Sequence, residues 1–436
     1  MKILAVNPPI IDFAAYDFWL KPYGFLVLLT YLKKQGFEID FVDCLEKKTK
    51  IDKFGRGRFF SQPFPKPTVV KNIPRRFKHY GLSIQELEER LKNTKPQIAF
   101  ITSSMTYWYL AVKETAHVVR KLHPYSKIAV GGNYINLCLR HAQNNIPADF
   151  YVQNNKLGKF LTGLGAKFEE SEFFSTLPQY EFFYPRLSYV VLRTSWGCPF
   201  RCSFCASHIL FKEFFRIESK TIVDFITYYY RRGIVDFVFY DDALLYPPSE
   251  AENLLRLINK KNLKVRFHTP NALHMKFLNL DIARLLKKCN FINPHFGLET
   301  LNKRYQQEWG NKVNSHDLGK TIKLMHKAGF KPGEFSVYLL LGYPGQNILG
   351  LKKEVEFLSR QGIKVSLAEF SPVPQTKMFK EHPLPFPDPL WHNNSLFGFY
   401  RKEEWPAIFE LKNYVRLLNQ KYNSNYRTDT QGFPFM

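Results

Sequence analysis

Three cysteines lie within eight residues of one another, and no fourth cysteine lies near them. They are Cys198, Cys202 and Cys205, in the stretch TSWGCPFRCSFCASH. Thiolates at C-x3-C-x2-C spacing on one loop can bind three irons of a [4Fe–4S] cubane, whose fourth iron then keeps an open position. An open metal position is a reactive one, as catalytic zinc sites show. The spacing therefore predicts an iron–sulfur centre that takes part in chemistry.

A structural zinc site is the alternative for these cysteines. It requires a fourth protein ligand, and His208 is nearby, but C-x3-C-x2-C-x2-H is not a common zinc spacing. The remaining cysteines, Cys44, Cys138 and Cys289, are scattered singly in apolar segments, which is typical of buried free thiols and not of a disulfide framework. The cysteine pattern therefore favours iron–sulfur over zinc.

Length and composition bound the fold. A chain of 436 residues exceeds the size at which one hydrophobic core stops growing, so two domains are expected. No apolar run approaches the roughly 20 residues of a membrane span, and Asn7, Pro8 and Pro9 interrupt the only candidate for the apolar part of a signal peptide. We therefore expect a cytoplasmic protein with no membrane span.

The formal charge of +24 attracts anions of every kind. It is compatible with nucleic acid, an acidic protein partner or anionic lipid, and equally with a solvated lysine-rich surface. Residues 53–81 mix basic and aromatic side chains most densely, and their prolines and glycines predict a loop.

Strand and helix patterns alternate in residues 1–153. Helical periodicity occurs at 24–34, 83–93 and 110–122. Short apolar runs between these helices predict buried strands at 2–6, 38–42, 97–102, 127–132 and 149–152. Such alternation predicts a doubly wound, Rossmann-like parallel sheet with its ligand beyond the carboxyl ends of the strands. Residues 154–186 show no clear period and are expected to be a linker.

A strand–helix unit repeats six times in residues 187–380. The expected strands are 187–193, 234–240, 264–268, 291–296, 335–341 and 364–370. Six such units predict a partial TIM-type (β/α)6 barrel, whose functional residues belong at the carboxyl ends of the strands. The cysteines follow directly on the first strand. Residues 381–436 remain as an irregular carboxyl-terminal extension.

The segment CPFRCSFC resembles the signature of the radical S-adenosylmethionine (SAM) enzymes, C-x3-C-x-aromatic-C at the end of the first barrel strand, with Phe204 as the aromatic residue. The resemblance implies that Cys198, Cys202 and Cys205 ligate the cluster, while the amino and carboxylate groups of SAM chelate the unique iron. One electron then cleaves the sulfonium to methionine and a 5′-deoxyadenosyl radical. The resemblance also implies a reduced flavodoxin or ferredoxin as the electron donor.

Later strand ends resemble further motifs of the same family. FVFYDDALL implies that Asp241 and Asp242 meet the ammonium of the cosubstrate, although adjacent aspartates at a loop start are also ordinary turn chemistry. HFGLETLN implies that Glu299 accepts hydrogen bonds from the ribose hydroxyls. YLLLGYPGQ implies that Gly342 and Gly345 let the backbone approach the adenosine closely.

A sixth-strand motif, Ser-Pro-x-Pro-Gly-Thr, has its counterpart in EFSPVPQT, where Gln375 replaces the usual glycine. Motifs at successive strand ends in barrel order are hard to obtain by chance. Together with the cysteine signature they extend the resemblance over the whole barrel.

The amino-terminal region resembles the cobalamin-binding-type domain that precedes the barrel in one branch of this superfamily. SSMTYWY and GGNYINLCLRHA carry this resemblance. It places Gly131 and Gly132 at the cofactor and makes Tyr107, Trp108 and Tyr134 candidates to wall the corrin face; the alternative is an aromatic strand end packed in the interior. The cobalt-ligating signature Asp-x-His-x-x-Gly is absent, so cobalamin is expected without a protein imidazole on cobalt.

These features predict an oxygen-sensitive radical SAM enzyme acting on a small-molecule or peptide substrate. Its expected reaction is cobalamin-dependent methylation of an unactivated carbon or phosphorus. Radical rearrangement without methyl transfer is the alternative if cobalamin is not used. An RNA-modifying enzyme is a third interpretation, against which the sequence shows no attached RNA-binding module and no second cysteine cluster. A non-enzymatic iron–sulfur protein is a fourth, and it leaves the cosubstrate motifs unexplained.

Overall fold

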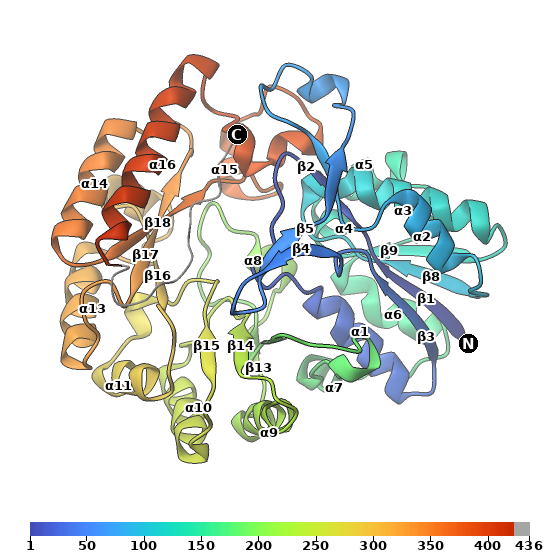
Figure 1. Cartoon of the computed structure of the whole chain (residues 1–436), viewed down its shortest axis with the longest axis horizontal. Helices are drawn as coiled ribbons and strands as arrows, with labels where there is room; N and C mark the ends of the chain where they lie inside the picture. Colours follow the sequence, from blue (N-terminus) through green and yellow to red (C-terminus); the bar gives the residue numbers. More distant parts are fainter. Residues whose placement is uncertain (423–436) are drawn as a thin grey trace. The chain divides into compact units, whose positions relative to one another are not determined.

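The structure, a computed structural model, describes residues 1–422 and divides the chain between two units (Figure 1). Unit 1 comprises Met1–Leu187, Val373–Gln375 and Pro385–Leu396. Unit 2 comprises Ser188–Pro372, Thr376–Leu384 and, within the described chain, residues 397–422. The extension expected from residue 381 is therefore not one body, because its residues 385–396 belong to unit 1.

A five-stranded parallel sheet forms the centre of unit 1. Its strand order is β10-β9-β8-β1-β3, and all four neighbouring pairs are parallel. The strands are β1 (Lys2–Asn7), β3 (Glu38–Asp43), β8 (Ile98–Ile101), β9 (Lys127–Gly131) and β10 (Phe150–Val152). In chain order this is 2-1-3-4-5, a doubly wound arrangement whose direction reverses between β1 and β8. The predicted parallel sheet is confirmed.

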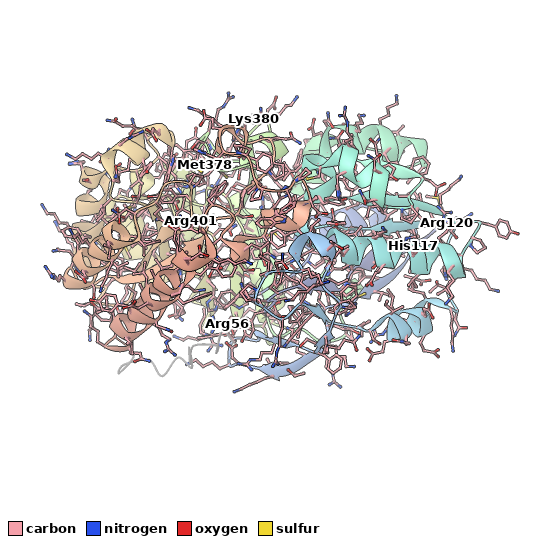
Figure 2. All side chains as sticks on the ribbon, turned by 90° about the horizontal axis from the view of Figure 1, so that it is seen from above. Arg56, His117, Arg120, Met378, Lys380 and Arg401 are labelled. Carbon is pink, nitrogen blue, oxygen red and sulfur yellow. The ribbon has the colours of Figure 1, made fainter. Side chains whose placement is uncertain are left out.

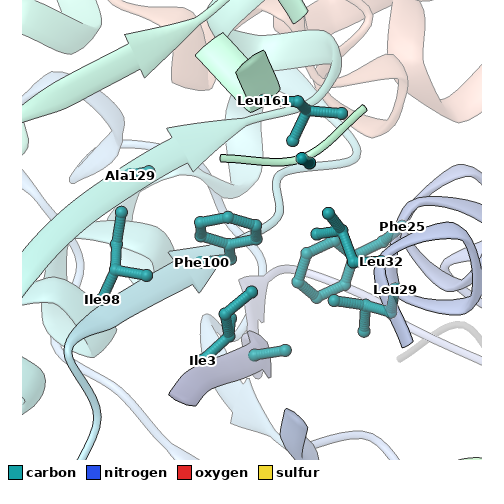
Figure 3. Packing of buried hydrophobic residues seen from close by; sticks show 10 residues of the cluster. Ile3, Phe25, Leu29, Leu32, Ile98, Phe100, Ala129 and Leu161 are labelled. Carbon is teal, nitrogen blue, oxygen red and sulfur yellow. The ribbon is translucent and has the colours of Figure 1, made fainter. Parts of the chain in front are cut away.

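Helices cover both faces of this sheet (Figure 1). One face carries α1 (Tyr23–Lys34) and α6 (Leu157–Gly163), and the other carries α2 (Ile84–Leu91) and α3 (Tyr109–Leu122). Figure 3 shows Ile3 and Phe100 of the sheet packed with Leu29 of α1 and Leu161 of α6.

The segment 154–186, expected to be a linker, belongs to unit 1 and contains two helices. These are α6 and α7 (Glu170–Ser175), and Leu161 of α6 is fully buried in the core. Helices of seven and six residues are shorter than the window in which a helical period becomes visible. Two further short helices, α4 (Asn133–Leu137) and α5 (Leu139–Asn145), follow β9.

Residues 53–81 differ from the expected loop because they contain short antiparallel strands. β5 (Gly57–Phe59) pairs with β4 (Lys48–Ile51), while β7 (Lys78–Tyr80) lies between β2 (Ile10–Asp12) and β6 (Ser61–Pro63). Three-residue strands carry too little alternation to be read from sequence. Pro63 ends β6, at the sheet edge, where a missing N–H does little harm.

Basic side chains lie on both units. Figure 2 labels Arg56 and Arg120 of unit 1 and Lys380 and Arg401 of unit 2, and each of these arginines pairs with a carboxylate of its own unit. In residues 1–422 no helix is long and apolar enough to cross a bilayer.

Six parallel strands in chain order build unit 2. They form two three-stranded sheets, which isolated parallel bridges join at Phe267–Phe291 and Leu273–Phe296. The strands are β11 (Val190–Leu192), β14 (Asp236–Phe239), β15 (Arg266–His268), β16 (His295–Glu299), β17 (Ser336–Leu341) and β18 (Lys364–Glu369). The intervening and following helices are α9 (Ser219–Tyr230), α10 (Pro248–Lys261), α11 (Leu280–Lys288), α12 (Lys303–Glu308), α13 (Ser315–Lys327), α14 (Ile348–Arg360), α15 (Lys377–Glu381) and α16 (Trp405–Gln420). The predicted partial barrel is confirmed.

The fourth barrel strand begins later than expected. Residues 291–296 were expected to form it, whereas β16 starts at His295. Asn290 and Asn293 both have a positive φ, 61° and 45°, which breaks the extended backbone before Pro294. Phe291 therefore contributes only an isolated bridge.

Candidate functional site

The three cysteines lie on the loop that leaves the first barrel strand. It follows the two-residue strand β12 (Ser195–Trp196) and precedes the short helix α8 (Ser207–Leu210). Cys202 is 6% exposed, and Cys198 and Cys205 are half-buried. Burial raises the pKa of the Cys198 thiol to about 11 and that of the Cys202 thiol to about 12. These thiols therefore need a cation or a metal beside them to act as thiolates.

The donor set fits a cubane better than a single ion. Ligands of one zinc ion must converge on one point, and among residues 1–422 no three His, Cys, Asp or Glu side chains do so. Thiolates on a [4Fe–4S] cluster each bind a different iron, so they can stand further apart. A cubane would need only the three cysteines of this loop, without His208.

Asp241 anchors the residues that lead into the cysteine loop. It follows β14 and is 3% exposed. Its Oδ1 accepts hydrogen bonds from Thr194 N at 2.9 Å, Thr194 Oγ1 at 2.6 Å and Ser195 Oγ at 2.6 Å, and its Oδ2 lies 3.1 Å from Thr194 N. Burial raises the pKa of Asp241, and these donors oppose that shift. Both carboxylate oxygens of Asp241 thus already accept hydrogen bonds from Thr194 or Ser195. The geometry therefore favours Asp241 as an anchor of the cysteine loop over contact with the cosubstrate ammonium.

Asp242, by contrast, keeps a half-buried carboxylate at the same strand end. Its Oδ2 accepts from Arg193 Nη1 at 3.1 Å. The side chains of Asp242 and Arg193 are 21% and 14% exposed, so this ion pair remains partly accessible to solvent.

Glu299 ends β16 next to a buried cation. Its Oε1 accepts a hydrogen bond from Lys312 Nζ at 2.7 Å, and the side chains of Glu299 and Lys312 are only 12% and 13% exposed. Burial alone would lower the pKa of Lys312, but Glu299 and the thiol of Cys202 raise it above its ordinary value. Lys312 therefore places a positive charge near the cysteines. No sequence motif pointed to Lys312.

The backbone around Glu299 is arranged for this pair. Glu299 has φ +68°, rare for a non-glycine residue, and the pairing register shifts between Gly297 and Glu299. A Cβ at Gly297 would lie 2.6 Å from Lys312 Nζ and 2.8 Å from Glu299 Oε1, so a side chain there would displace the ends of this ion pair. Strain of this kind clusters at functional sites.

Phe204 belongs to an aromatic cluster behind the cysteine loop. Its ring meets Trp309 edge-on at 5.6 Å, and Trp309 in turn stacks on Tyr305 at 5.3 Å. The cluster also contains Leu340, Tyr343, Ala368, Phe370, Met378 and Phe399. It is an apolar cluster of tilted and edge-on rings next to the motif residues.

Gly342 and Gly345 shape the loop after β17. Their φ angles are +97° and +71°, which only glycine adopts without strain. Gln346 holds the loop because its Oε1 accepts from Gly342 N and its Nε2 donates to Leu340 O, each at 2.7 Å. A Cβ at Gly342 would come within 3.1 Å of Phe397.

A cavity in unit 1 opens where the strand order reverses. It is a small, partly open pocket beyond the carboxyl ends of β1 and β8. Pro8 and Pro9 line one side, and Ser103, Ser104 and Trp108 line another. Ligands of doubly wound sheets bind at this reversal point.

Trp108 is fixed at the wall of this cavity. Its Nε1 donates to Asp12 Oδ2 at 2.7 Å, while Asn393 Nδ2 donates to Asp12 Oδ1 at 2.6 Å. Of the three expected corrin-facing aromatics, Trp108 lines the cavity, whereas Tyr107 and Tyr134 are 7% and 0% exposed within the chain. For these two tyrosines the alternative of interior packing fits better.

The glycine pair after β9 supports the cavity edge. Ser103 Oγ donates to Gly131 O at 2.6 Å, and Asn133 N donates to Ser103 O at 2.9 Å. Gly132 has φ +95°, and a Cβ there would lie 2.1 Å from Ser103 O. Gly131 and Gly132 thus position Ser103 through close backbone approach.

Gln375, at the motif's glycine position, has a left-handed backbone that favours glycine. Its φ is +70°, and its Nε2 donates to Asn136 O and Leu137 O, both at 3.0 Å. The side chain thus makes contacts that glycine could not make.

Comparison with known proteins agrees with this fold. Residues 193–358 match the family model of the radical SAM superfamily. An uncharacterized methyltransferase of Pyrococcus horikoshii is 23% identical over 196 residues, 44% of this chain and 41% of that protein. An uncharacterized protein of Methanopyrus kandleri is 26% identical over 208 residues, 44% of this chain and 39% of that protein. The match thus spans about two fifths of each relative's length.

Two solved structures are similar in fold over most of this chain. TsrM, a radical S-adenosylmethionine methyltransferase from Kitasatospora setae solved with cobalamin and a [4Fe–4S] cluster, gives a TM-score of 0.65 at 16% identity over 94% of this chain and 90% of that chain. OxsB, a cobalamin-dependent S-adenosylmethionine radical enzyme, gives a TM-score of 0.59 at 13% identity over 97% of this chain and 61% of that chain. At these identities the likeness establishes the fold. Residues 193–358 thus carry a radical SAM superfamily domain.

Proposed function

We propose that this chain binds a [4Fe–4S] cluster through Cys198, Cys202 and Cys205, cleaves SAM there, and methylates an unactivated centre with the help of cobalamin. The observation that carries the proposal is the buried three-cysteine loop at the first barrel strand, with a charged pair beside it. The cluster, when bound, supplies the electron that breaks the sulfonium bond. TsrM and OxsB support the cofactor set, since their structures hold cobalamin with a cluster or with SAM.

In this proposal Glu299 and Lys312 bind and orient the cosubstrate. Lys312 occupies Oε1 of Glu299, whereas Oε2 makes no hydrogen bond within residues 1–422 and can accept from the ribose hydroxyls. The apolar cluster around Phe204 and Trp309 is proposed to pack against the adenine ring and to exclude water.

Replacement of Glu299 by glutamine is expected to weaken SAM binding by at least tenfold while the cluster stays intact. The ribose hydroxyls lose a charged acceptor worth roughly 1.5 to 3 kcal/mol. Equilibrium binding to the anaerobically reconstituted protein measures this loss. The control is Glu308→Gln, which makes the same change at an exposed carboxylate on α12 and should leave the affinity unchanged. Equal affinities of all three proteins would remove Glu299 from the site.

Cobalamin is assigned to the cavity of unit 1. The cavity combines serine hydroxyls with an indole held in place, and among residues 1–422 no histidine lines it. Substitution of Trp108 by alanine is expected to reduce cobalamin retention severalfold, and Tyr125→Ala, at a 98% exposed position, should not.

The cobalt(II) electron paramagnetic resonance (EPR) spectrum should show no splitting from a protein imidazole nitrogen.

Two outcomes would contradict the cobalamin assignment. Imidazole splitting would refute a histidine-free site, and the absence of any cobalt uptake would exclude methyl transfer through cobalamin. In the second case radical rearrangement becomes the better interpretation.

The proposed partners follow from the chemistry. The cluster needs an outside electron, and an acidic flavodoxin or ferredoxin complements a chain with a charge of +24. The substrate is proposed to be a small molecule or a peptide. A cytoplasmic location agrees with six cysteines that are all free thiols.

A further inference from the structure

A histidine from another barrel loop reaches the cysteine loop. His274 follows β15 and immediately precedes the 3-10 helix at Met275–Phe277. Its Nε2 lies 3.8 Å from Cys198 Sγ, although the two residues are 76 positions apart in the chain. This distance suits a long hydrogen bond to sulfur. The barrel fold alone brings this pair together.

The imidazole of His274 is held rigidly against the loop. It is 4% exposed, and its ring lies 5.0 Å from that of Phe200 at an interplanar angle of 32°. Phe277 packs on it at 5.8 Å. Because Phe200 lies between Cys198 and Cys202 in sequence, the histidine packs on the metal-binding loop itself.

The hydrogen bonding of His274 is incomplete without the cluster ligand. Its Nδ1 is buried and has no hydrogen-bond partner in residues 1–422, so the contact of Nε2 with Cys198 is the polar interaction that the described structure gives this ring. Buried polar groups are nearly always paired, and an exception calls for an explanation. A thiolate can only accept a hydrogen bond, so bonding to a ligating Cys198 fixes the tautomer with the proton on Nε2.

Resting on the proposed cluster site, we propose that His274 is a positioning residue that donates a hydrogen bond from Nε2 to Sγ of Cys198 and thereby raises the reduction potential of the cluster. Hydrogen bonds to the sulfurs are one of the factors that set the potential of iron–sulfur clusters. Reduction adds negative charge to the cluster and its thiolates. A fixed donor stabilises the reduced state more than the oxidised one, so the external donor transfers its electron more favourably.

His274→Phe tests this role because it keeps a planar ring and removes both nitrogens. The variant is expected to hold the full complement of iron and sulfide, while the equilibrium constant for one-electron reduction falls about tenfold, a shift of about 59 mV to lower potential. EPR-monitored redox titration measures it. His274→Gln, which restores an N–H donor, should recover most of the shift, and His316→Phe at an exposed position of α13 should cause none. An unchanged potential in His274→Phe would overturn the proposal.

A second measurement uses the unaltered protein, so that it does not depend on how a variant folds. After labelling with 15N-histidine, pulsed EPR of the reduced cluster should detect a weak coupling to one imidazole nitrogen. No coupling would overturn the proposal, and so would a coupling as strong as that of a directly bound imidazole. Unaltered protein that takes up no iron would instead refute the proposed cluster, so the two failures are distinguishable.

Discussion

Alanine at Cys198, Cys202 or Cys205 is expected to abolish the iron–sulfur absorbance of the anaerobically reconstituted protein. In the proposed cluster each thiolate binds its own iron, so loss of one thiolate leaves an iron without its protein ligand. The effect should be nearly complete, from about four irons per chain to almost none. Absorbance together with iron and sulfide analysis measures it.

The matched control is Cys138→Ala. Cys138 is a free, half-buried cysteine of unit 1, outside the barrel. Its substitution should leave the iron content unchanged. A triple variant without Cys198, Cys202 and Cys205 that still holds four irons per chain would refute the assignment.

Substitution of Asp241 by alanine is expected to destabilise unit 2 by about 3 to 5 kcal/mol. The substitution leaves the hydrogen-bond donors of Thr194 and Ser195 without their acceptor. Both residues lie directly before the cysteine loop and are fully buried. Each buried donor left unpaired costs roughly 1 to 3 kcal/mol. Urea unfolding of the cluster-free protein, followed by tryptophan fluorescence, measures the shift.

The neighbouring aspartate provides the comparison. Asp242→Ala removes a half-buried pair with Arg193, so it should cost no more than about 1 kcal/mol. The opposite outcome for Asp241, a normal unfolding midpoint with loss of SAM affinity, would return this residue to the cosubstrate.

The strands of the parallel sheets were predictable where they contain short runs of apolar residues. Ile3, Leu4, Ala5 and Val6 are all fully buried, as expected for a strand with helices on both faces. The cysteine loop was predictable for a different reason. Ligands on one loop must keep a fixed spacing, and a fixed spacing can be read directly from sequence.

The remaining site residues carry no such spacing. His274 and Lys312 reach the cysteine loop only through the closure of the barrel, and each is an ordinary polar residue in its own segment. Asp241 shows the converse limit. Its position after β14 was predictable, but the direction of its carboxylate depends on donors 47 positions earlier.

The short elements of unit 1 escaped prediction because their order comes from tertiary packing. Leu161 on α6 is buried against α1 and the sheet, while β5, β6 and β7 are three residues each. Segments of this length have little intrinsic stability and little periodicity.

The division of the chain between the units also fixes the order in which they can be completed during synthesis. Unit 1 begins at the amino terminus, yet Asn393 supplies one of the hydrogen bonds to its buried Asp12, and Asp388 accepts one from Tyr109. At about 5 to 20 residues per second, the ribosome needs roughly 10 to 40 s to proceed from Leu187 to Leu396. During that interval Asp12 is a carboxylate lacking one of its donors, and the cavity wall formed by Trp108 lacks its final support. The barrel is therefore nearly complete on the ribosome before the domain that precedes it.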